Sequence, residues 1–548
     1  MTMTDSPPAT AQASDEGIAA PRVAFGPYSW ITTGDHKRIG LMWVSVSTLL
    51  FAAVAVLGVI NGFERSSADQ IDIYGGINAY FQMWSLYRVA LVLLVVVPLF
   101  VGIATVVVPM QVGSTNLAFP RAALGAFWTW LIGAGITIAA VFVGGGWGAL
   151  DGVTADEADA ISLTLVGTGM LILGLMLASI CIATTVVSMR TSGMNLARVP
   201  LFSWSMLVAA SVWIITLPVA LANLMLAYVD LHHGGPGMFG NPEAVLGATA
   251  IWEQLDWLVS QPQVFAWAIP VVGVLGTIVP VAAGVRHINH SVMLGLTALF
   301  GLFSIGAWSQ PFFHDGTEQF VFISFGLIVV IPVLGSLAGA AATLAGGEGI
   351  RISDTHLIAA LGAALVLLAG AVSGALRVIQ PFHLIERSTT TGVFNLVMLA
   401  AITAGVAGLW FWSSKITGHS ISPTIGKLAV LDLILGALVL GITDVVSGFM
   451  ESSDFLLATP TSSTADALNL VSAVGAVVVA LGALGVLAAF IGALGSGAPH
   501  SGDDPWDGHT LEWSTTSPPI ESNFASPLAK VGSESPLLDQ LENEEETS

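Results

Sequence analysis

Twelve apolar stretches, each long enough to cross a lipid bilayer as a helix, constrain this 548-residue chain more than any other feature. A spanning helix needs about 20 predominantly apolar residues. Because the bilayer core holds no water, the backbone polar groups must be satisfied internally, as they are in a helix. We therefore predict an all-α polytopic membrane protein. The stretches cover residues 38–61, 79–110, 122–145, 161–189, 200–229, 250–283, 290–313, 319–345, 354–376, 391–413, 428–450 and 467–495.

Charge supports the same fold class. Charged residues make up 9% of the chain, whereas a soluble protein carries about a quarter. This excludes a soluble domain, a disordered chain and a nucleic-acid binder. The polar segments then divide the chain into a flexible N-terminal tail (1–30), a twelve-helix membrane domain (31–497) and an acidic C-terminal tail (498–548), whose only basic residue is Lys530.

Lysine and arginine predict the orientation, because they are concentrated on the cytoplasmic side of membrane proteins. With the N-terminus inside, eleven basic residues lie in the inner segments. The outer loops contain only Arg65, Arg377 and Arg387. We therefore expect both termini in the cytoplasm.

Four segments resemble a known family in their order and spacing. They are GDHKRIG at 34–40, VVPLFVGIATVVVPMQVGSTNLAFPRAALGAFWTWL at 96–131, SMRTSGMNLARVPLFSWSMLV at 188–208 and PWDGHTLEWSTTSPPIESNF at 505–524. The chain is similar to subunit I of cytochrome c oxidase, in the heme-copper oxidase superfamily. The resemblance implies twelve helices, a prokaryotic plasma membrane, subunit II-like and subunit III-like partners, and a family chemistry of electron transfer to oxygen with proton pumping.

The resemblance also implies two hemes and one copper, held by six histidines. Counting from the matching motifs, none of the six positions is a histidine here. The former heme-ligand positions are Tyr87, Gly392 and Phe394, and the former copper-ligand positions are Gln261, Gln310 and Pro311. The family's proton-path positions are also changed, to Asn116, Gln263 and Ser336. We therefore predict no heme and no copper, with bulky side chains such as Phe394 filling the vacated space.

Two further groups of residues are candidates for a site. An intramembrane charge is costly and usually has a partner, so we hypothesise a structural ion pair between Arg88 and a carboxylate at the same level, among Glu253, Asp256 and Asp444. Histidines in the outer segments are weak candidates for a surface metal site. They are His232, His233, His314 and His383.

Three functions follow as alternatives. The first is a redox-inactive structural or assembly subunit of a respiratory-type membrane complex, in contact with lipid and with other membrane subunits. The second is an active terminal oxidase that uses non-standard ligands. The third is a carrier of a small ligand in the vacated cavities.

Overall fold

The computed structural model describes most of the chain, in two compact units, Met1–Thr33 and Gly34–Ser548. The first unit contains a short helix, α1 (Tyr28–Ile31). The second contains every helix that is described below. The described residues are Gly26, 28–66, 73–148, 155–233, 250–309, 316–347, Ile350, 352–385, 387–450, Ser452, 463–495 and 497–547.

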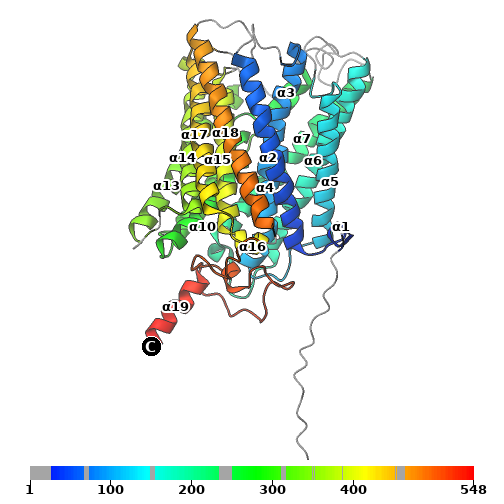
Figure 1. Ribbon diagram of the computed structural model, residues 1–548. Helices are drawn as coiled ribbons and strands as arrows, with labels where there is room; N and C mark the ends of the chain where they lie inside the picture. The colour runs from blue at the N-terminus through cyan, green and yellow to red at the C-terminus, as the bar shows by residue number, and fades with distance from the viewer. Residues whose placement is uncertain are drawn as a thin grey trace, which may run out of the picture. The chain divides into compact units, whose positions relative to one another are not determined.

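The second unit is a bundle of long helices that run side by side (Figure 1). Within the described residues, eleven helical runs are long and apolar enough to cross a membrane. The helices are α2 (His36–Ser66), α3 (Ile77–Ala90), the π-helix η1 (Leu91–Val96), α4 (Val97–Gln111), α5 (Pro120–Phe142), α6 (Ala155–Ser188), η2 (Leu196–Arg198), α7 (Leu201–His233), α9 (Ala250–Asp256), η3 (Gln263–Ala268), α10 (Ile269–Ala283), α11 (His290–Phe303), α12 (Gly316–Ile328), α13 (Val330–Ala345), α14 (Thr355–Arg377), η4 (Gln380–Phe382), α15 (Thr389–Phe411), α16 (Ser413–Thr417), α17 (Pro423–Phe449), α18 (Ser463–Leu494), η5 (Leu511–Ser514) and α19 (Pro536–Thr547).

The all-helical fold class is confirmed, but the structure differs from the expected twelve spans at the sixth and seventh stretches. The expected span at 290–313 is represented by α11, which has only 14 residues, and residues 310–313 lie outside the described part. The expected span at 250–283 is interrupted between α9 and η3, at Trp257–Pro262. Pro262 has no backbone N–H and disfavours a helical conformation at the preceding residue.

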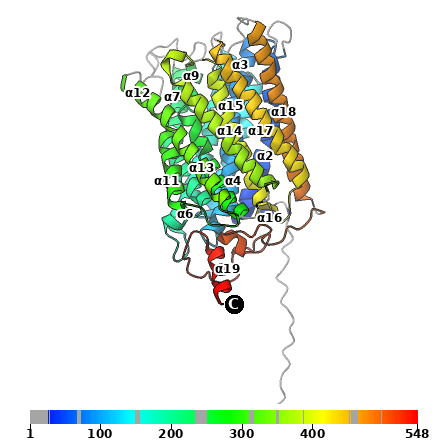
Figure 2. The same cartoon turned by 90° about the vertical axis from the view of Figure 1, so that its left-hand side faces the viewer.

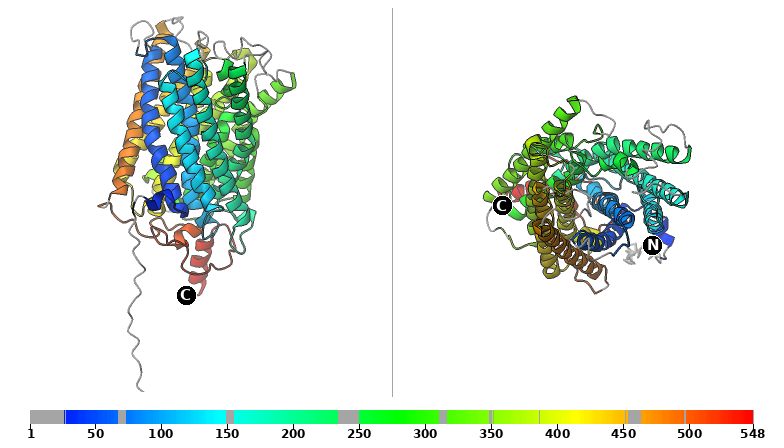
Figure 3. Two further views of the ribbon diagram at one scale, coloured as in Figure 1. Left: turned by 90° about the vertical axis from the view of Figure 1, so that its right-hand side faces the viewer. Right: turned by 90° about the horizontal axis from the view of Figure 1, so that it is seen from above.

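Three helical runs form the centre of the bundle. Nearly every residue of α3–η1–α4, η3–α10 and α15 is buried by protein, whereas the other spans keep much of their surface exposed. Seen along the helix axes, the remaining helices surround this centre (Figure 3). The long apolar side chains of the outer helices, such as Leu428 and Leu435 on α17, are exposed. This arrangement suits lipid outside and a packed core inside.

Glycines allow the closest contacts between helices. A Cβ added to Gly475 on α18 would lie 2.6 Å from the backbone nitrogen of Leu440 on α17. On the same α17–α18 contact, a Cβ at Gly436 would lie 2.8 Å from the backbone nitrogen of Val479. Small residues at such positions let helix backbones approach, and dispersion contacts then drive association within a membrane.

The C-terminal tail lies across one end of the bundle and ends in α19, which projects away from it (Figure 2). Trp506 donates from its indole nitrogen to the Phe411 carbonyl at 2.9 Å. Arg286, which follows α10, pairs with Asp539 and Glu542 of α19, each at 2.6 Å. The tail is therefore an ordered part of the second unit, and we call the end that it covers the tail face.

The α17–α18 contact generates a stability prediction. We expect Gly475→Ala to lower stability by about 1–3 kcal/mol, because the new methyl group must push backbone atoms apart. Thermal unfolding of the purified protein in detergent measures the effect. Gly492→Ala on the same helix is the matched control, since nothing lies within 4 Å of its added Cβ. Equal melting temperatures for the two variants would contradict this account of the packing.

Candidate functional site

Tyr87 and Phe394, which come from different helices, line one cavity of about 50 Å³. Tyr87 lies on α3 and Phe394 on α15. Arg65, Arg88 and Asp444 also line the cavity. Pockets for small molecules usually measure about 300–1,000 Å³, so this cavity has room for a few waters and for nothing as large as a heme.

A hydrogen-bond network centred on Asp444 closes one side of the cavity. The Asp444 carboxylate is 1% exposed and forms an ion pair with Arg65. It also accepts hydrogen bonds from Ser472 Oγ at 2.9 Å and from Asn395 Nδ2 at 3.4 Å. The Tyr87 hydroxyl donates to Asn395 Oδ1 at 3.2 Å. Tyr87 is therefore held in a network of protein side chains.

Arg88 occupies the other side of the cavity and is 1% exposed. Its guanidinium carbon lies 4.1 Å from the ring centroid of Trp84 and 5.7 Å from that of Phe394. It also donates to Thr391 Oγ1. Such cation–π contacts stabilise a charge that has been removed from water.

The structure divides the hypothesised group of charges into separate pairs. Arg88 Nη1 lies 3.8 Å from Asp256 Oδ1, whose side chain is 39% exposed. Asp444 pairs instead with Arg65, and Glu253 is on the exposed face of α9. Arg65 was expected in an outer loop, but it lies in the last turn of α2, which continues to Ser66, and its side chain pairs with the buried Asp444. The sequence signal for this site, which was missed, is the group of polar residues in the last turns of α2, Asn61, Glu64 and Arg65.

The former copper-ligand position Gln261 and the former proton-path position Gln263 are held by protein contacts. Gln261 Nε2 donates to the Gly374 carbonyl at 3.2 Å, and a Cβ on Gly326 would meet the same nitrogen at 2.5 Å. The backbone amide of Gly306 donates to Gln263 Oε1 at 2.8 Å. Both glutamine amides thus join neighbouring segments. Gln310 and Pro311 lie outside the described residues.

Gly392 faces α17. A Cβ there would meet the Gly441 carbonyl oxygen and Val445 Cγ2, both at 2.7 Å. The structure therefore places Gly392 at a close helix crossing, whereas Phe394 on the same helix lines the cavity. This crossing leaves no space for an imidazole at position 392 without separating α15 from α17.

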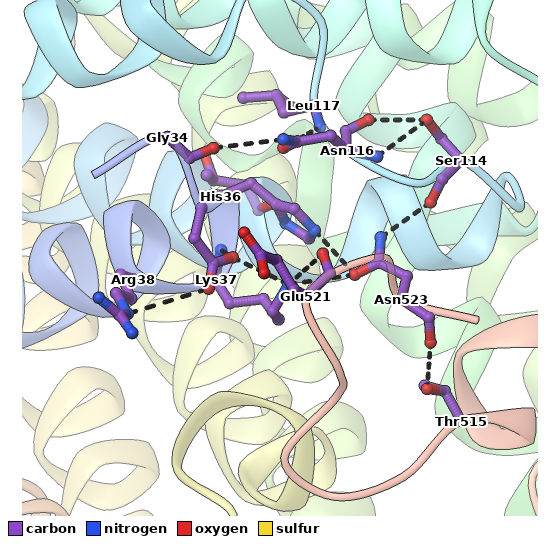
Figure 4. Close-up of polar contacts among 12 residues, drawn as sticks. Gly34, His36, Lys37, Arg38, Ser114, Asn116, Leu117, Thr515, Glu521 and Asn523 are labelled. Carbon is purple, nitrogen blue, oxygen red and sulfur yellow. Dashed lines mark hydrogen bonds and ion pairs between the residues drawn. The ribbon is translucent and has the colours of Figure 1, made fainter. Parts of the chain in front are cut away.

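The former proton-path positions also make structural contacts. Asn116 Nδ2 donates to the Gly34 carbonyl at 3.2 Å (Figure 4). Ser336 Oγ donates to the Pro332 carbonyl at 2.7 Å within α13. Neither side chain is ionisable, and each donates a hydrogen bond to a backbone carbonyl.

The tail closes the bundle beside Asn116, through Asn523 (Figure 4). Asn523 Oδ1 lies 3.0 Å from His36 Nε2 on α2, and Asn523 Nδ2 donates to the Ser114 carbonyl at 2.8 Å. The Asn523 carbonyl accepts from Thr515. One tail residue therefore connects the start of α2, the segment after α4 and the tail itself.

Two buried charged side chains fix the tail further. Lys415 Nζ donates to the carbonyls of Asp503 at 2.8 Å and Thr515 at 2.6 Å, and burial lowers the pKa of Lys415 to about 8. Glu512 accepts from Gln111 Nε2 at 2.8 Å and from Trp412 Nε1 at 3.2 Å. Burial raises the pKa of Glu512. Neither residue was singled out from the sequence, although Glu512 lies within the tail motif at 505–524.

The candidate metal histidines have other surroundings. His232 Nε2 lies 3.0 Å from Ser162 Oγ, and His383 follows η4 in a left-handed conformation. The side chain of His233 and the whole of His314 lie outside the described residues. Among the side chains that the structure describes, no three His, Cys, Asp or Glu residues lie close enough to hold a metal ion.

The following known proteins match this chain over most of its length, and all of them are described as oxidases or oxidase subunits. The family described as "Cytochrome C and Quinol oxidase polypeptide I" matches residues 38–478. A putative cytochrome c oxidase subunit 1-beta from Streptomyces avermitilis is 27% identical, with 97% of this chain and 95% of that protein covered. Cytochrome c oxidase subunit 1 of Bacillus subtilis is 25% identical over 91% of this chain and 80% of its own length. A heme-copper terminal oxidase structure aligns with a TM-score of 0.66 at 17% identity, covering 93% of this chain and 89% of its own.

The two ion pairs beside the cavity generate a prediction. Arg65→Ala leaves the Asp444 carboxylate buried without its cation, so we expect a loss of about 3–5 kcal/mol. Asp256→Ala removes a partner that is partly exposed and 3.8 Å from Arg88. The buried guanidinium keeps its contacts with Trp84, Phe394 and Thr391, so we expect a smaller loss of about 1–3 kcal/mol. Chemical unfolding of both variants measures the difference. The double variant Arg65→Ala/Asp444→Ala should recover part of the loss, and equal effects for the two single variants would contradict the assignment.

Proposed function

The chain belongs to the family of cytochrome c and quinol oxidase polypeptide I, and we propose that it is a redox-inactive member of that family, a subunit of a respiratory-type membrane complex. It is a multi-pass membrane protein. In this proposal it serves as a structural or assembly subunit in a prokaryotic plasma membrane, with its tail face in the cytoplasm. Its partners are membrane proteins like subunits II and III of the oxidases.

The observation that carries the proposal is the cavity between Tyr87 and Phe394. The two axial ligands of one heme must face each other across a space as large as the heme. Tyr87 and Phe394 do line one space, but it measures about 50 Å³ and is bordered by Arg88 and by the Asp444 network. Phe394 has no atom that can ligate iron, and the Tyr87 hydroxyl is bonded to Asn395. These residues do not fit a low-spin heme.

The other described family positions support the same proposal. Copper and heme iron are usually held by imidazole or sulfur ligands. The former copper-ligand position Gln261 carries an amide that is bonded to the Gly374 backbone, and the former heme-ligand position Gly392 carries no side chain. At the position of the family's proton-carrying carboxylate this chain has the amide of Gln263, which accepts a hydrogen bond from the backbone of Gly306. We derive no redox step through this region.

The second candidate function is an active terminal oxidase. It is favoured by the names of the relatives, which are cytochrome c oxidase subunits over nearly the full length of this chain. An oxidase would need iron and copper ligands other than the six family positions. The two functions therefore differ in what the purified protein must contain.

The visible spectrum and the metal content of the purified full-length chain test the proposal. We expect no Soret band, and iron and copper far below one atom per chain, because the family's ligand positions hold no imidazole. A heme-copper terminal oxidase purified by the same procedure is the control, since it shows whether detergent extraction retains the cofactors. Stoichiometric heme in this protein would overturn the redox-inactive function.

Partner identification then tests the remaining part of the proposal. We expect mild cross-linking in native membranes, followed by purification, to recover other membrane subunits in a fixed ratio to this chain. A preparation that contains this chain alone, from membranes in which the control oxidase retains its subunits, would contradict a role as a complex subunit.

A further inference from the structure

Three histidines and one glutamate line a small cavity between the C-terminal tail and the helices. His287 and His290 come from the loop between α10 and α11 and from the start of α11, whereas His509 and Glu534 belong to the tail. The cavity measures about 30 Å³, which is room for roughly two water molecules. The cluster therefore lies at the junction that must open if the tail leaves the bundle.

Each imidazole has one buried nitrogen without a hydrogen-bond partner: Nε2 of His287, Nε2 of His290 and Nδ1 of His509. His287 and His509 are 7% and 5% exposed. His287 Nδ1 lies 2.8 Å from the Ile288 carbonyl, which can only accept, so the proton belongs on Nδ1 and the Nε2 lone pair is free. Each of these rings can take up a proton. Among the described residues, no group of three His, Cys, Asp or Glu side chains could hold a metal ion.

The charges around the cluster are few. Glu534 acts on both His287 and His290, while Arg286 and Asp507 act on His509. Arg286 is itself paired with Asp539 and Glu542. Arg198 of η2, which precedes the lining residue Pro200 in the chain, donates to the carbonyls of Gly193 and Val531. α10 and α13, which pack against His287, contribute no titratable side chain to the cavity.

We propose that His287, His290 and His509 form a proton-controlled latch, which holds the C-terminal tail against the helices while the imidazoles are neutral and releases it when they are charged. One carboxylate, Glu534, cannot balance three imidazolium ions in a cavity of this size. Release of the tail gives each charged ring access to water. The proposal does not depend on whether the protein binds heme.

The direction of the pH dependence follows from burial. In the docked state burial lowers the pKa of His287, and it lowers the pKa of His509 to about 4 from the ordinary 6.5. The undocked state therefore binds more protons than the docked state at low pH. Docking of the tail is strongest above pH 6.5 and weakens as the pH falls. His509 alone should reduce the docking constant about 30-fold at pH 5.

Other tail groups act in the opposite direction. Burial raises the pKa of Asp504 and of Glu512, so their protonation at low pH favours the docked tail. A pH titration of the unmodified protein measures the sum of these effects. Replacement of the three histidines isolates the part due to the latch.

A spin label on the tail of the full-length protein tests the latch. Ala529→Cys places the label at an exposed tail position, and the native Cys181 is buried. We expect a less mobile spectrum at pH 8 and a growing, more mobile component between pH 6.5 and pH 5. The triple variant His287→Gln/His290→Gln/His509→Gln should keep its pH 8 spectrum at pH 5.

Two further variants keep the test decisive. If the triple variant does not fold, His509→Gln alone serves instead, since it leaves the loop histidines in place. It should cut the ratio of the more mobile to the less mobile component at pH 5 by about 30-fold. His500→Gln is the matched control, because His500 is in the tail but contacts the Ser517 carbonyl instead of the cavity. A spectrum that does not change between pH 8 and pH 5, or the same pH midpoint with and without the three histidines, would overturn the proposal.

Discussion

The exclusion of water from the bundle requires that a buried charge find its partner within the protein, and the rest of the interior is arranged around that requirement. The Asp444 carboxylate shows this clearly, since Arg65, Ser472 and Asn395 reach it from three different helices. In the low dielectric of a membrane protein, a carboxylate without these donors would cost several kcal/mol. The same network engages Tyr87, so one buried charge determines the surroundings of the cavity.

The interior and the tail face use polar groups in different ways. Inside, amides such as Gln261 and Gln263 join helix segments through backbone groups, and glycines such as Gly392 bring helices into direct contact. At the tail face, charged side chains such as Lys415 and Glu512 are buried by the folded tail. One of the segments that resemble the family, at 505–524, belongs to the tail, and in the structure the tail closes one end of the bundle.

Much of the fold could be predicted from the sequence, because spanning helices depend on long apolar stretches that are visible without any contact information. The interruption at Pro262 and the short α11 could not be derived from hydropathy, since a hydropathy window averages over the few residues at which a helix breaks. Tyr87 and Phe394, which were identified by counting from motifs, line one cavity. The pairing of Arg65 with Asp444 was missed because it depends on where α2 ends and on which helices are neighbours. The histidine cluster at the tail was missed for a similar reason, since it joins residues more than two hundred positions apart.

The contact between His36 and Asn523 has a consequence for the biogenesis of the protein. The two residues are 487 positions apart, and Asn523 is one of the residues that connect α2 to the tail. Synthesis proceeds from the N-terminus, and domains generally fold as units while the chain is made. The helices enter the membrane long before residue 523 leaves the ribosome, so the tail face must stay open throughout insertion. A chain truncated before the tail would therefore keep an open tail face. The polar groups of His36 and Ser114 would stay exposed there and accessible to quality-control proteins on that side of the membrane.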